Sequence, residues 1–314
     1  MNNLIRNSEF FLVKFPIIFP IIYFFILFTF PNFETELIFI TILLLAETHF
    51  GATWPFFLDK VNKQFIKEKK FSLIIFPIGI FIFSILGFFL FKNTFLLIFF
   101  AANVYHVTRQ SFGVCKLYCN LQSEKIFQEY LIYFLNLLFF IVAFFRFYYP
   151  LITNDHLFIL NTSILLLLFL LFVFYVIKFK FSDNFLTFVT GSIIFYPVCF
   201  VSNPVHAIIM GVTMHYTQYL FLTHYVYRSR KKEENPNFKS FIFNRYVITI
   251  LIYSMIMSLF SIFGKFDSNI LKQLILIPII GQIIHFYLDS QLWKFSEKHN
   301  RDNILRFINN LKNI

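Results

Sequence analysis

Charged residues are scarce in this chain, at 14 % of its 314 residues, whereas a soluble globular protein carries about 25 %. An ordinary water-soluble enzyme is therefore excluded. The chain has only three cysteines, which is too few for a disulfide framework. Intrinsic disorder is excluded as well, because disordered chains are poor in aromatic residues and this chain has 52 Phe and 16 Tyr.

Several short motifs with known chemistry are missing too. The sequence has no G-x-S-x-G motif, no P-loop, no G-x-G-x-x-G motif and no H-E-x-x-H motif. It also lacks C-x-x-C-H, which argues against covalently attached haem. The net charge of +11 does not predict nucleic-acid binding, because Lys and Arg lie in short segments between apolar runs rather than in a binding patch.

Long apolar runs dominate the sequence, and each is close to the roughly 20 residues that a helix needs to cross a bilayer. They predict an all-α, polytopic transmembrane helical bundle. About ten spans are expected, at residues 10–30, 37–58, 71–91, 94–114, 130–149, 157–177, 186–202, 204–227, 246–263 and 273–293. Residues 1–295 then form a single transmembrane domain, and residues 296–314 form a short amphipathic cytoplasmic tail.

The positive charges predict the orientation of these spans. If the N-terminus is cytoplasmic, 23 of the 27 Lys and Arg residues fall on the inner side, and the outer side holds Lys92, Arg146, Lys265 and Lys272. Cytoplasmic segments of membrane proteins carry an excess of Lys and Arg. The charge distribution therefore predicts an even number of spans with both termini cytoplasmic.

The ionisable residues inside the spans are unevenly distributed. Acidic residues and histidines concentrate in spans two, four, eight and ten, which hold Glu47, His49, His106, His206, His215, His224, His285 and Asp289. An ionisable group at bilayer depth is costly, so each of them is a candidate functional residue.

Four of these histidines lie at similar depth. His49, His106, His285 and His215 precede the first inner Lys or Arg by 11, 10, 9 and 13 residues. At 1.5 Å rise per residue, this places them roughly 13–20 Å from the inner boundary. Four separate helices are therefore expected to bring imidazoles into one layer.

Helical spacing predicts which groups share a face. His285 and Asp289 are four residues apart and lie on the same side of a helix. Glu47 and His49 are two residues apart, about 200° around the axis, so a straight helix cannot direct both at one point. His206 lies at the outer end of its span, where an interface residue is expected rather than a ligand.

Imidazole is the commonest metal ligand in proteins, and together with carboxylates it suits iron, zinc or copper. A pocket of four or five histidines with Glu and Asp can hold one or two iron ions that keep open positions for oxygen. Two other interpretations remain open. One is a proton-coupled membrane transporter that uses the same residues without metal, and the other is a haem-binding electron-transfer protein. Hydrogen bonding between helices, without any ligand, is the simplest explanation for a single buried histidine.

Two fragments, His49-Phe50-Gly51 and His285-x-x-x-Asp289, resemble elements of the Brp/Blh family of bacterial membrane β-carotene dioxygenases. The resemblance covers a few residues in two spans, and the family's early Pro-His-Gly-Ala pattern is absent here. It implies a multi-span bundle whose histidines bind iron, and an oxygen-dependent reaction on a hydrophobic substrate. It also implies a multi-pass protein of the bacterial inner (cytoplasmic) membrane.

These features predict an integral-membrane, metal-dependent oxidoreductase or oxygenase that acts on a lipid or isoprenoid substrate, with one or two non-haem iron ions as cofactor. The expected partners are the bilayer, the hydrophobic substrate and an electron donor. The predicted metal ligands are His49, His106, His215, His224, His285 and Asp289. Glu47 and Asp289 are the predicted catalytic carboxylates, as ligands or as orienting partners of the imidazoles. The residues predicted to position substrate or ligands are Gln110, Arg109 and Gln218.

Overall fold

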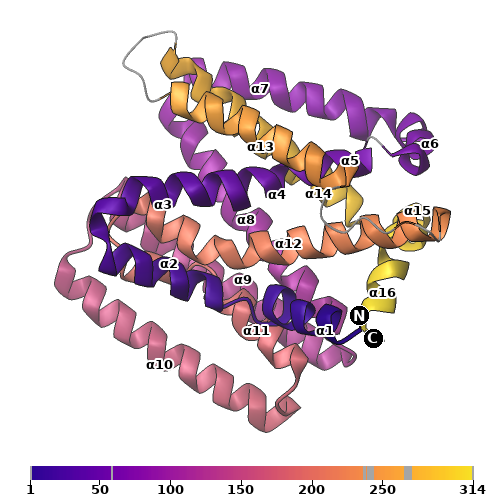
Figure 1. Cartoon of the computed structure of the whole chain (residues 1–314). Helices are drawn as coiled ribbons and strands as arrows, with labels where there is room; N and C mark the ends of the chain where they lie inside the picture. Colours follow the sequence, from indigo (N-terminus) through magenta and orange to yellow (C-terminus); the bar gives the residue numbers. More distant parts are fainter. Residues whose placement is uncertain (1, 58, 236–237, 239–243, 265–270, 313–314) are drawn as a thin grey trace. The chain divides into compact units, whose positions relative to one another are not determined.

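Helices account for all the regular structure in the part of the chain that the computed structural model describes, residues 2–57, 59–235, 238, 244–264 and 271–312 (Figure 1). No strand occurs in these ranges, so the predicted all-α class is confirmed. Five residues used in the sequence argument lie outside the described residues. They are Leu58 in the second predicted span, the cations Lys239 and Lys265 of the charge count, and Asn313 and Ile314 at the end of the predicted tail.

The helices cluster into two compact units. Unit 1 comprises residues 1–38 and 104–218, and unit 2 comprises residues 39–103 and 219–314. The chain passes between the units within three helices, which are α3 (Glu34–Thr41), α8 (Lys92–Tyr118) and α12 (Pro204–Glu234).

Unit 1 contains, besides its parts of these three helices, α1 (Asn2–Glu9), η1 (Phe10–Lys14), α2 (Ile18–Thr29), η2 (Pro31–Phe33), α9 (Gln122–Ala143), η5 (Phe144–Tyr148), α10 (Asn154–Phe179), α11 (Asp183–Ile193) and η6 (Tyr196–Cys199). Helix α11 packs against α9 and against η1. The first predicted span is broken, because the helical segments Asn3–Lys14 and Ile18–Thr29 meet at 64°. Pro16 lies at this break, where its missing N–H cannot continue the helix.

Unit 2 contains η3 (Ile42–Ala46), α4 (Glu47–Gly51), α5 (Trp54–Phe57), α6 (Lys60–Glu68), η4 (Phe71–Ile75), α7 (Phe76–Leu90), α13 (Arg245–Phe263), η7 (Leu271–Ile275), α14 (Leu276–Leu292), α15 (Lys298–Asn300), η8 (Arg301–Leu305) and α16 (Arg306–Lys312). Helix α4 packs against α13, and α7 packs against α14. The C-terminal tail is helical and turns apolar side chains inward, since Phe307, Ile308 and Leu311 are buried.

Six helices are long and apolar enough to cross a membrane, or up to seven if the bent N-terminal pair is one span. They are Pro31–Phe57, Phe71–Leu90, Gln122–Tyr148, Asn154–Phe179, Arg245–Phe263 and Leu271–Leu292. Each of the six overlaps a predicted span. The predicted spans 94–114 and 204–227 lie within the long helices α8 and α12, whose polar residues reduce their hydropathy. The count of ten spans therefore stays a prediction.

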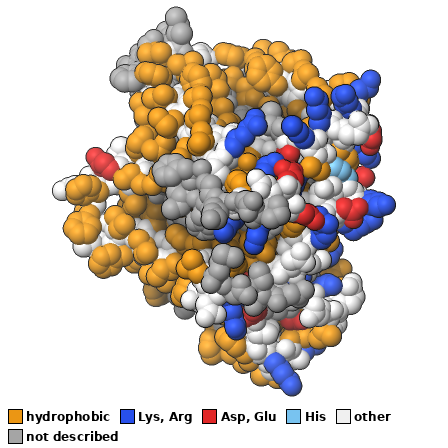
Figure 2. Space-filling model, turned by 45° about the vertical axis from the view of Figure 1, so that its right-hand side comes forward, with side chains coloured by type: hydrophobic (Ala, Val, Ile, Leu, Met, Phe, Trp, Pro, Cys, Tyr) orange, Lys and Arg blue, Asp and Glu red, His pale blue; other side chains and the backbone are white. Residues whose placement is uncertain are grey.

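Five of the six membrane-length helices are mostly unburied, and the exception is Pro31–Phe57, which is 56 % buried. Only 22 % of the membrane-length window of Phe71–Leu90 is buried, and only 11 % of that of Asn154–Phe179. Figure 2 shows hydrophobic side chains over much of the visible surface. In water such a surface would be unfavourable, because soluble proteins rarely expose large contiguous apolar areas. These surfaces suit a membrane protein.

Two glycines let helices of unit 2 approach one another closely around Tyr253 of α13. A Cβ on Gly51 would lie 2.9 Å from the Tyr253 Cδ1 atom, and a Cβ on Gly281 would lie 2.7 Å from its hydroxyl oxygen. The ring of Tyr253 therefore contacts α4 on one side and α14 on the other. Both helices carry candidate functional residues.

The segment just before α4 is a π-helical turn, η3, rather than a regular α-helical one. Such a turn contains one extra residue and loosens the regular hydrogen bonding of the helix. The hydroxyl of Ser254 on α13 donates a hydrogen bond to the Leu43 carbonyl oxygen inside this turn. This contact fixes the turn from which Glu47 and His49 follow.

Candidate metal-binding residues

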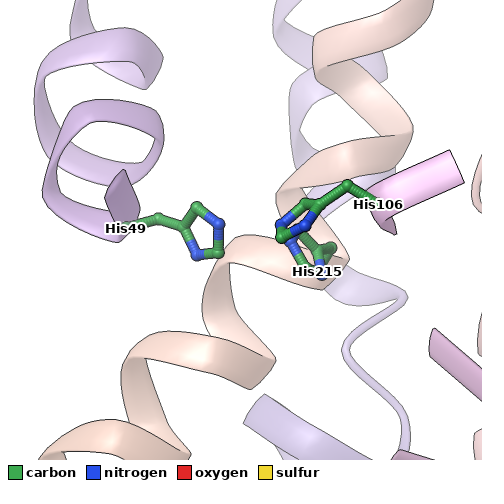
Figure 3. A group of neighbouring side chains, drawn as sticks. All are labelled: His49, His106 and His215. Atoms are coloured by element: carbon green, nitrogen blue, oxygen red, sulfur yellow. The ribbon is translucent and has the colours of Figure 1, made fainter. Parts of the chain in front are cut away.

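Unit 1 brings together two of the predicted ligands, His106 of α8 and His215 of α12 (Figure 3). Their ring centroids are 5.6 Å apart and the rings are perpendicular. The exposed fractions are 7 % for His106 and 2 % for His215. One ring nitrogen of each lies within 4.8 Å of the other, close enough for both to bind a single ion.

The position of His215 depends on a glycine one turn before it. A Cβ on Gly211 would lie only 1.7 Å from the carbonyl oxygen of Ile194, so only glycine fits at this approach of α12 to the end of α11. One turn beyond His215, buried Gln218 donates a hydrogen bond of 2.7 Å to the carbonyl oxygen of Val13. Unit 1 therefore fixes α12 on both sides of this histidine.

Unit 2 brings together three more predicted ligands. The ring of His49 on α4 lies 4.6 Å, centroid to centroid, from the ring of His285 on α14. His285 and Asp289 lie one turn apart on α14, as their spacing predicts, and a ligand atom of each lies within 4.8 Å of the other. All three side chains are at most 1 % exposed.

A chain of hydrogen bonds joins His285 to Asp289 through two hydroxyl groups. The Thr53 Oγ1 atom lies 2.7 Å from His285 Nδ1 and 3.2 Å from the Tyr219 hydroxyl oxygen. The Tyr219 hydroxyl donates to Asp289 Oδ1. Each hydroxyl can accept one hydrogen bond and donate the next. The chain is consistent with a proton on Nδ1 of His285, which would leave Nε2 as the atom that can bind a metal.

The same carboxylate oxygen of Asp289 accepts a second hydrogen bond, of 2.8 Å, from the indole N–H of Trp293. Carboxylates that bind metals are commonly oriented by hydrogen bonds of this kind, and metal-bound histidines commonly donate their second N–H to a partner. Thr53, Tyr219 and Trp293 thus orient His285 and Asp289 in the way that a metal site requires.

The buried residues that could hold a metal ion are, within the described part of the chain, His106 and His215 in unit 1 and His49, His285 and Asp289 in unit 2. The structure thus supports metal binding by buried His and Asp residues. That the imidazoles of the two units bind the same ion stays a prediction from the sequence.

The remaining predicted site residues in unit 2 lie elsewhere. Glu47 is 1 % exposed, and its Oε1 atom accepts a hydrogen bond of 3.4 Å from Gln282. His224 is half-buried, with its Nε2 atom 3.3 Å from the Asn244 amide nitrogen and its ring against Tyr246. Neither belongs to the buried groups that could hold an ion, so their roles in catalysis and metal binding stay predictions.

In unit 1, Gln110 is half-buried and Arg109 is exposed, so neither is enclosed with His106 on α8. His206, expected at a membrane interface, is buried within unit 1, with 1 % of its side chain exposed. Its Nδ1 atom lies 2.7 Å from the Tyr23 hydroxyl, and its Nε2 atom lies 3.0 Å from a carboxylate oxygen of Glu34. Both of its ring nitrogens therefore have protein partners, which explains why it can be buried.

Three of the orienting residues were not predicted as site residues. Tyr219 and Trp293 fit an aromatic belt at the membrane interface by sequence, but Tyr219 is only 4 % exposed. The spacing of Trp293 does carry a signal, because it follows its partner Asp289 by four residues, whereas the partner of Thr53, His285, is 232 residues away. Tyr219 has no such local signal, since its partner Asp289 is 70 residues away.

Comparison with known proteins gives no relative for this chain: no family model, no curated protein and no solved structure matches it.

Proposed function

We propose that this chain is an integral-membrane, metal-dependent oxidoreductase that uses non-haem iron to oxidise a lipid or isoprenoid. The observation that carries the proposal is the arrangement in unit 2. There, His49, His285 and Asp289 are buried together; His285 is hydrogen-bonded with Thr53, and Asp289 accepts hydrogen bonds from Tyr219 and Trp293. Imidazole and carboxylate ligands with open positions suit non-haem iron that reacts with oxygen. The short resemblance of these same spans to membrane β-carotene dioxygenases points to the same reaction class.

The chemical types of these donors suit such an ion. Two imidazoles and one carboxylate are the ligand types of non-haem iron oxygenases, and the bound metal would supply oxygen activation and one-electron chemistry. The protein's own part is to hold these groups in place and to keep water away. His49 and His285 would bind through ring nitrogens, and Asp289 through the carboxylate. Tyr219 and Trp293 would hold Asp289 Oδ1 and so direct its other oxygen.

The surroundings suit a water-free reaction. Helices α4 and α14 both belong to membrane-length apolar segments, Pro31–Phe57 and Leu271–Leu292. A substrate dissolved in the bilayer can reach such residues without entering water, and exclusion of water protects reactive intermediates from side reactions. In this proposal the protein spans the inner membrane of a bacterium about ten times with both termini cytoplasmic, and a soluble or membrane-bound electron donor reduces the metal.

The central experiment is metal analysis of detergent-purified protein. We expect about one or two iron ions per chain, lost in His49→Ala, His285→Ala and Asp289→Ala. His156→Ala is the matched control, because His156 is exposed and bonds only to Thr153 near the start of α10. Metal-free protein, or iron that survives all three ligand substitutions as it survives the control, would contradict the proposal.

The same measurement tests the prediction from the sequence that unit 1 contributes ligands to the same centre. If one ion binds all four imidazoles, His106→Ala and His215→Ala should each abolish iron binding as completely as His49→Ala. If the two units bind metal independently, each substitution should remove only part of the iron.

A proton-coupled transporter is the second candidate, and one observation favours it. The hydrogen-bonded series His285, Thr53, Tyr219 and Asp289 is a continuous path along which a proton can be passed. Membrane transporters place such groups near the middle of the bilayer. Metal-free protein that moves protons across vesicles, and loses this activity in Tyr219→Phe, would support the transporter instead. A Soret band in the visible spectrum would identify the third alternative, a haem protein.

A further inference from the structure

A hollow of about 300 Å³ opens on the surface of unit 2, beside the residues discussed above. Helix α7 contributes Gly79, Phe83 and Ser84 to its lining, α8 contributes Phe95 and Phe99, and α14 contributes Ile283. We call it the α7–α8 groove. Its volume is at the lower end of the range of small-molecule sites.

Small residues create the groove. A Cβ placed on Gly79 would meet no atom within 4 Å, so the glycine leaves open space between the Phe side chains of its own helix. Ser84 is the only lining residue with a polar side chain, and all the others are apolar. A groove without charge and with a single hydroxyl cannot recognise a polar ligand, because every polar group placed in it would lose hydrogen bonds to water. Its chemistry fits a hydrocarbon chain.

The wall of the groove continues to a candidate metal ligand. The ring of Phe99 stacks on Phe286, with centroids 6.3 Å apart and an angle of 16°. Phe286 in turn packs against Phe50, and the Phe50 ring lies 5.2 Å from the ring of His285. Ile283 itself lines the groove two residues before His285 on α14. A continuous series of aromatic contacts thus connects the groove to His285.

The groove and the ligand also lie at the same depth in the predicted membrane. Gly79 follows Lys70 by nine residues, and His285 precedes Lys294 by nine. At 1.5 Å per residue both lie roughly 13 Å from the inner boundary. Helix α7, which forms one side of the groove, has a largely unburied apolar surface, and in the predicted membrane this surface would face lipid. A chain in the bilayer can therefore enter the groove sideways at the level of His285.

We propose that the α7–α8 groove binds the hydrocarbon chain of the substrate and admits it from the bilayer toward His285. The proposal rests on the function proposed above and narrows its substrate class to a long, unbranched acyl chain without a charged group along its length. The rings of Phe99, Phe286 and Phe50 form the barrier that such a chain must pass or displace.

The experiment uses full-length protein in lipid nanodiscs and, as probe, palmitic acid that carries a photoreactive diazirine near its methyl end. After illumination, mass spectrometry locates the label. We expect labelling to concentrate on the groove residues Phe83, Phe95 and Phe99, to saturate, and to be reduced by unlabelled palmitic acid. Saturation and competition separate a binding site from the bulk lipid around every membrane helix.

Gly79→Phe is the decisive variant, because it fills the groove without meeting any other atom of the protein at its Cβ. It should lower labelling of Phe95 and Phe99 about tenfold, as a clash with the occupant predicts. Ala102→Phe, on the α8 side of the groove, should act in the same direction. Gly113→Phe is the matched control, since a Cβ on Gly113 also meets open space but lies outside the groove, and it should leave labelling unchanged.

Two results would overturn the proposal. One is labelling spread evenly over exposed residues of α7 such as Phe81 and Phe89, and the other is labelling that both Gly79→Phe and Ala102→Phe leave unchanged. Iron content is measured on the same samples. Normal iron without groove labelling refutes the groove alone, whereas groove labelling on protein that binds no iron refutes the proposed function and leaves a lipid-binding groove.

Discussion

Replacing Tyr219 by Phe is the most direct test of how the residues of unit 2 are organised. The substitution removes one hydroxyl and keeps the buried ring, which lies 4.4 Å from the ring of His49. Asp289 Oδ1 then loses the hydrogen bond from this hydroxyl and keeps the one from Trp293, and Thr53 loses one partner. The shape of the site is unchanged, so any effect reports the hydrogen bond.

The expected loss of iron affinity can be estimated in two independent ways. A hydrogen bond to a charged group contributes about 1.5–3 kcal/mol, and each 1.4 kcal/mol is tenfold in affinity. Substitution of residues that orient metal ligands commonly weakens metal binding about 10–100-fold. Both predict that Tyr219→Phe binds iron about 10–100-fold more weakly. Metal content measured after equilibration with a series of chelator concentrations gives this ratio directly.

Tyr175→Phe is the matched control. Tyr175 of α10 is fully buried, and its hydroxyl also donates to a carboxylate, Glu124, in a network with Gln128 that contains no histidine. Both variants lose a buried tyrosine–carboxylate hydrogen bond, so both should unfold at somewhat lower temperature. Only Tyr219→Phe should release metal more easily. Equal metal affinities in the two variants would refute the proposed role of Tyr219.

Three further changes test other parts of the structure. Gly211→Ala places a Cβ 1.7 Å from the Ile194 carbonyl oxygen and should destabilise the protein by about 1–3 kcal/mol or more. The melting temperature in detergent should fall accordingly, whereas Gly113→Ala, whose Cβ meets open space, should leave it unchanged. Asp59→Asn keeps the N-cap of α6 but leaves buried Arg230 without its carboxylate partner at 3.1 Å, which should cost about 3–5 kcal/mol in the same assay. Burial, and secondarily the positive charge of Arg230, lowers the pKa of His299 from its ordinary value of 6.5. The folded protein therefore favours the neutral imidazole, whose ring stacks on Phe65. The stability that the neutral His299 contributes should be lost as pH falls below about 6.5. Hydrogen exchange in residues 298–312 should then become faster, and this pH dependence should be absent in His299→Phe.

Much of the helical architecture could be predicted from the sequence, because long apolar runs require helices in a bilayer. The pairing of His285 with Asp289 was also predictable, since a separation of four residues places both on one face of a helix. The break between η1 and α2 was not predicted, because residues 10–30 were expected to form one continuous span.

The partners of the site residues could not be predicted in the same way. Thr53 contacts His285 across 232 positions of the chain, and Tyr219 contacts Asp289 across 70. Such contacts depend on how helices pack, and hydropathy alone does not encode this. The burial of His206 is a similar case, because it depends on Glu34, which lies 172 residues earlier in the sequence.

The π-helical turn before α4 makes the length of its segment as important as its composition. One residue advances an α-helix by about 100° around its axis. The π-helical turn takes up one extra residue, so deletion of a single residue between Ile42 and Ala46 would restore regular winding and leave the direction of His49 almost unchanged. Deletion of one residue within the regular helix α3 would instead rotate His49 by about 100° relative to the residues that precede the deletion. Both deletions shorten the span by one residue and hardly change its hydropathy. We therefore expect metal binding by His49 to tolerate the first deletion and to be lost on the second.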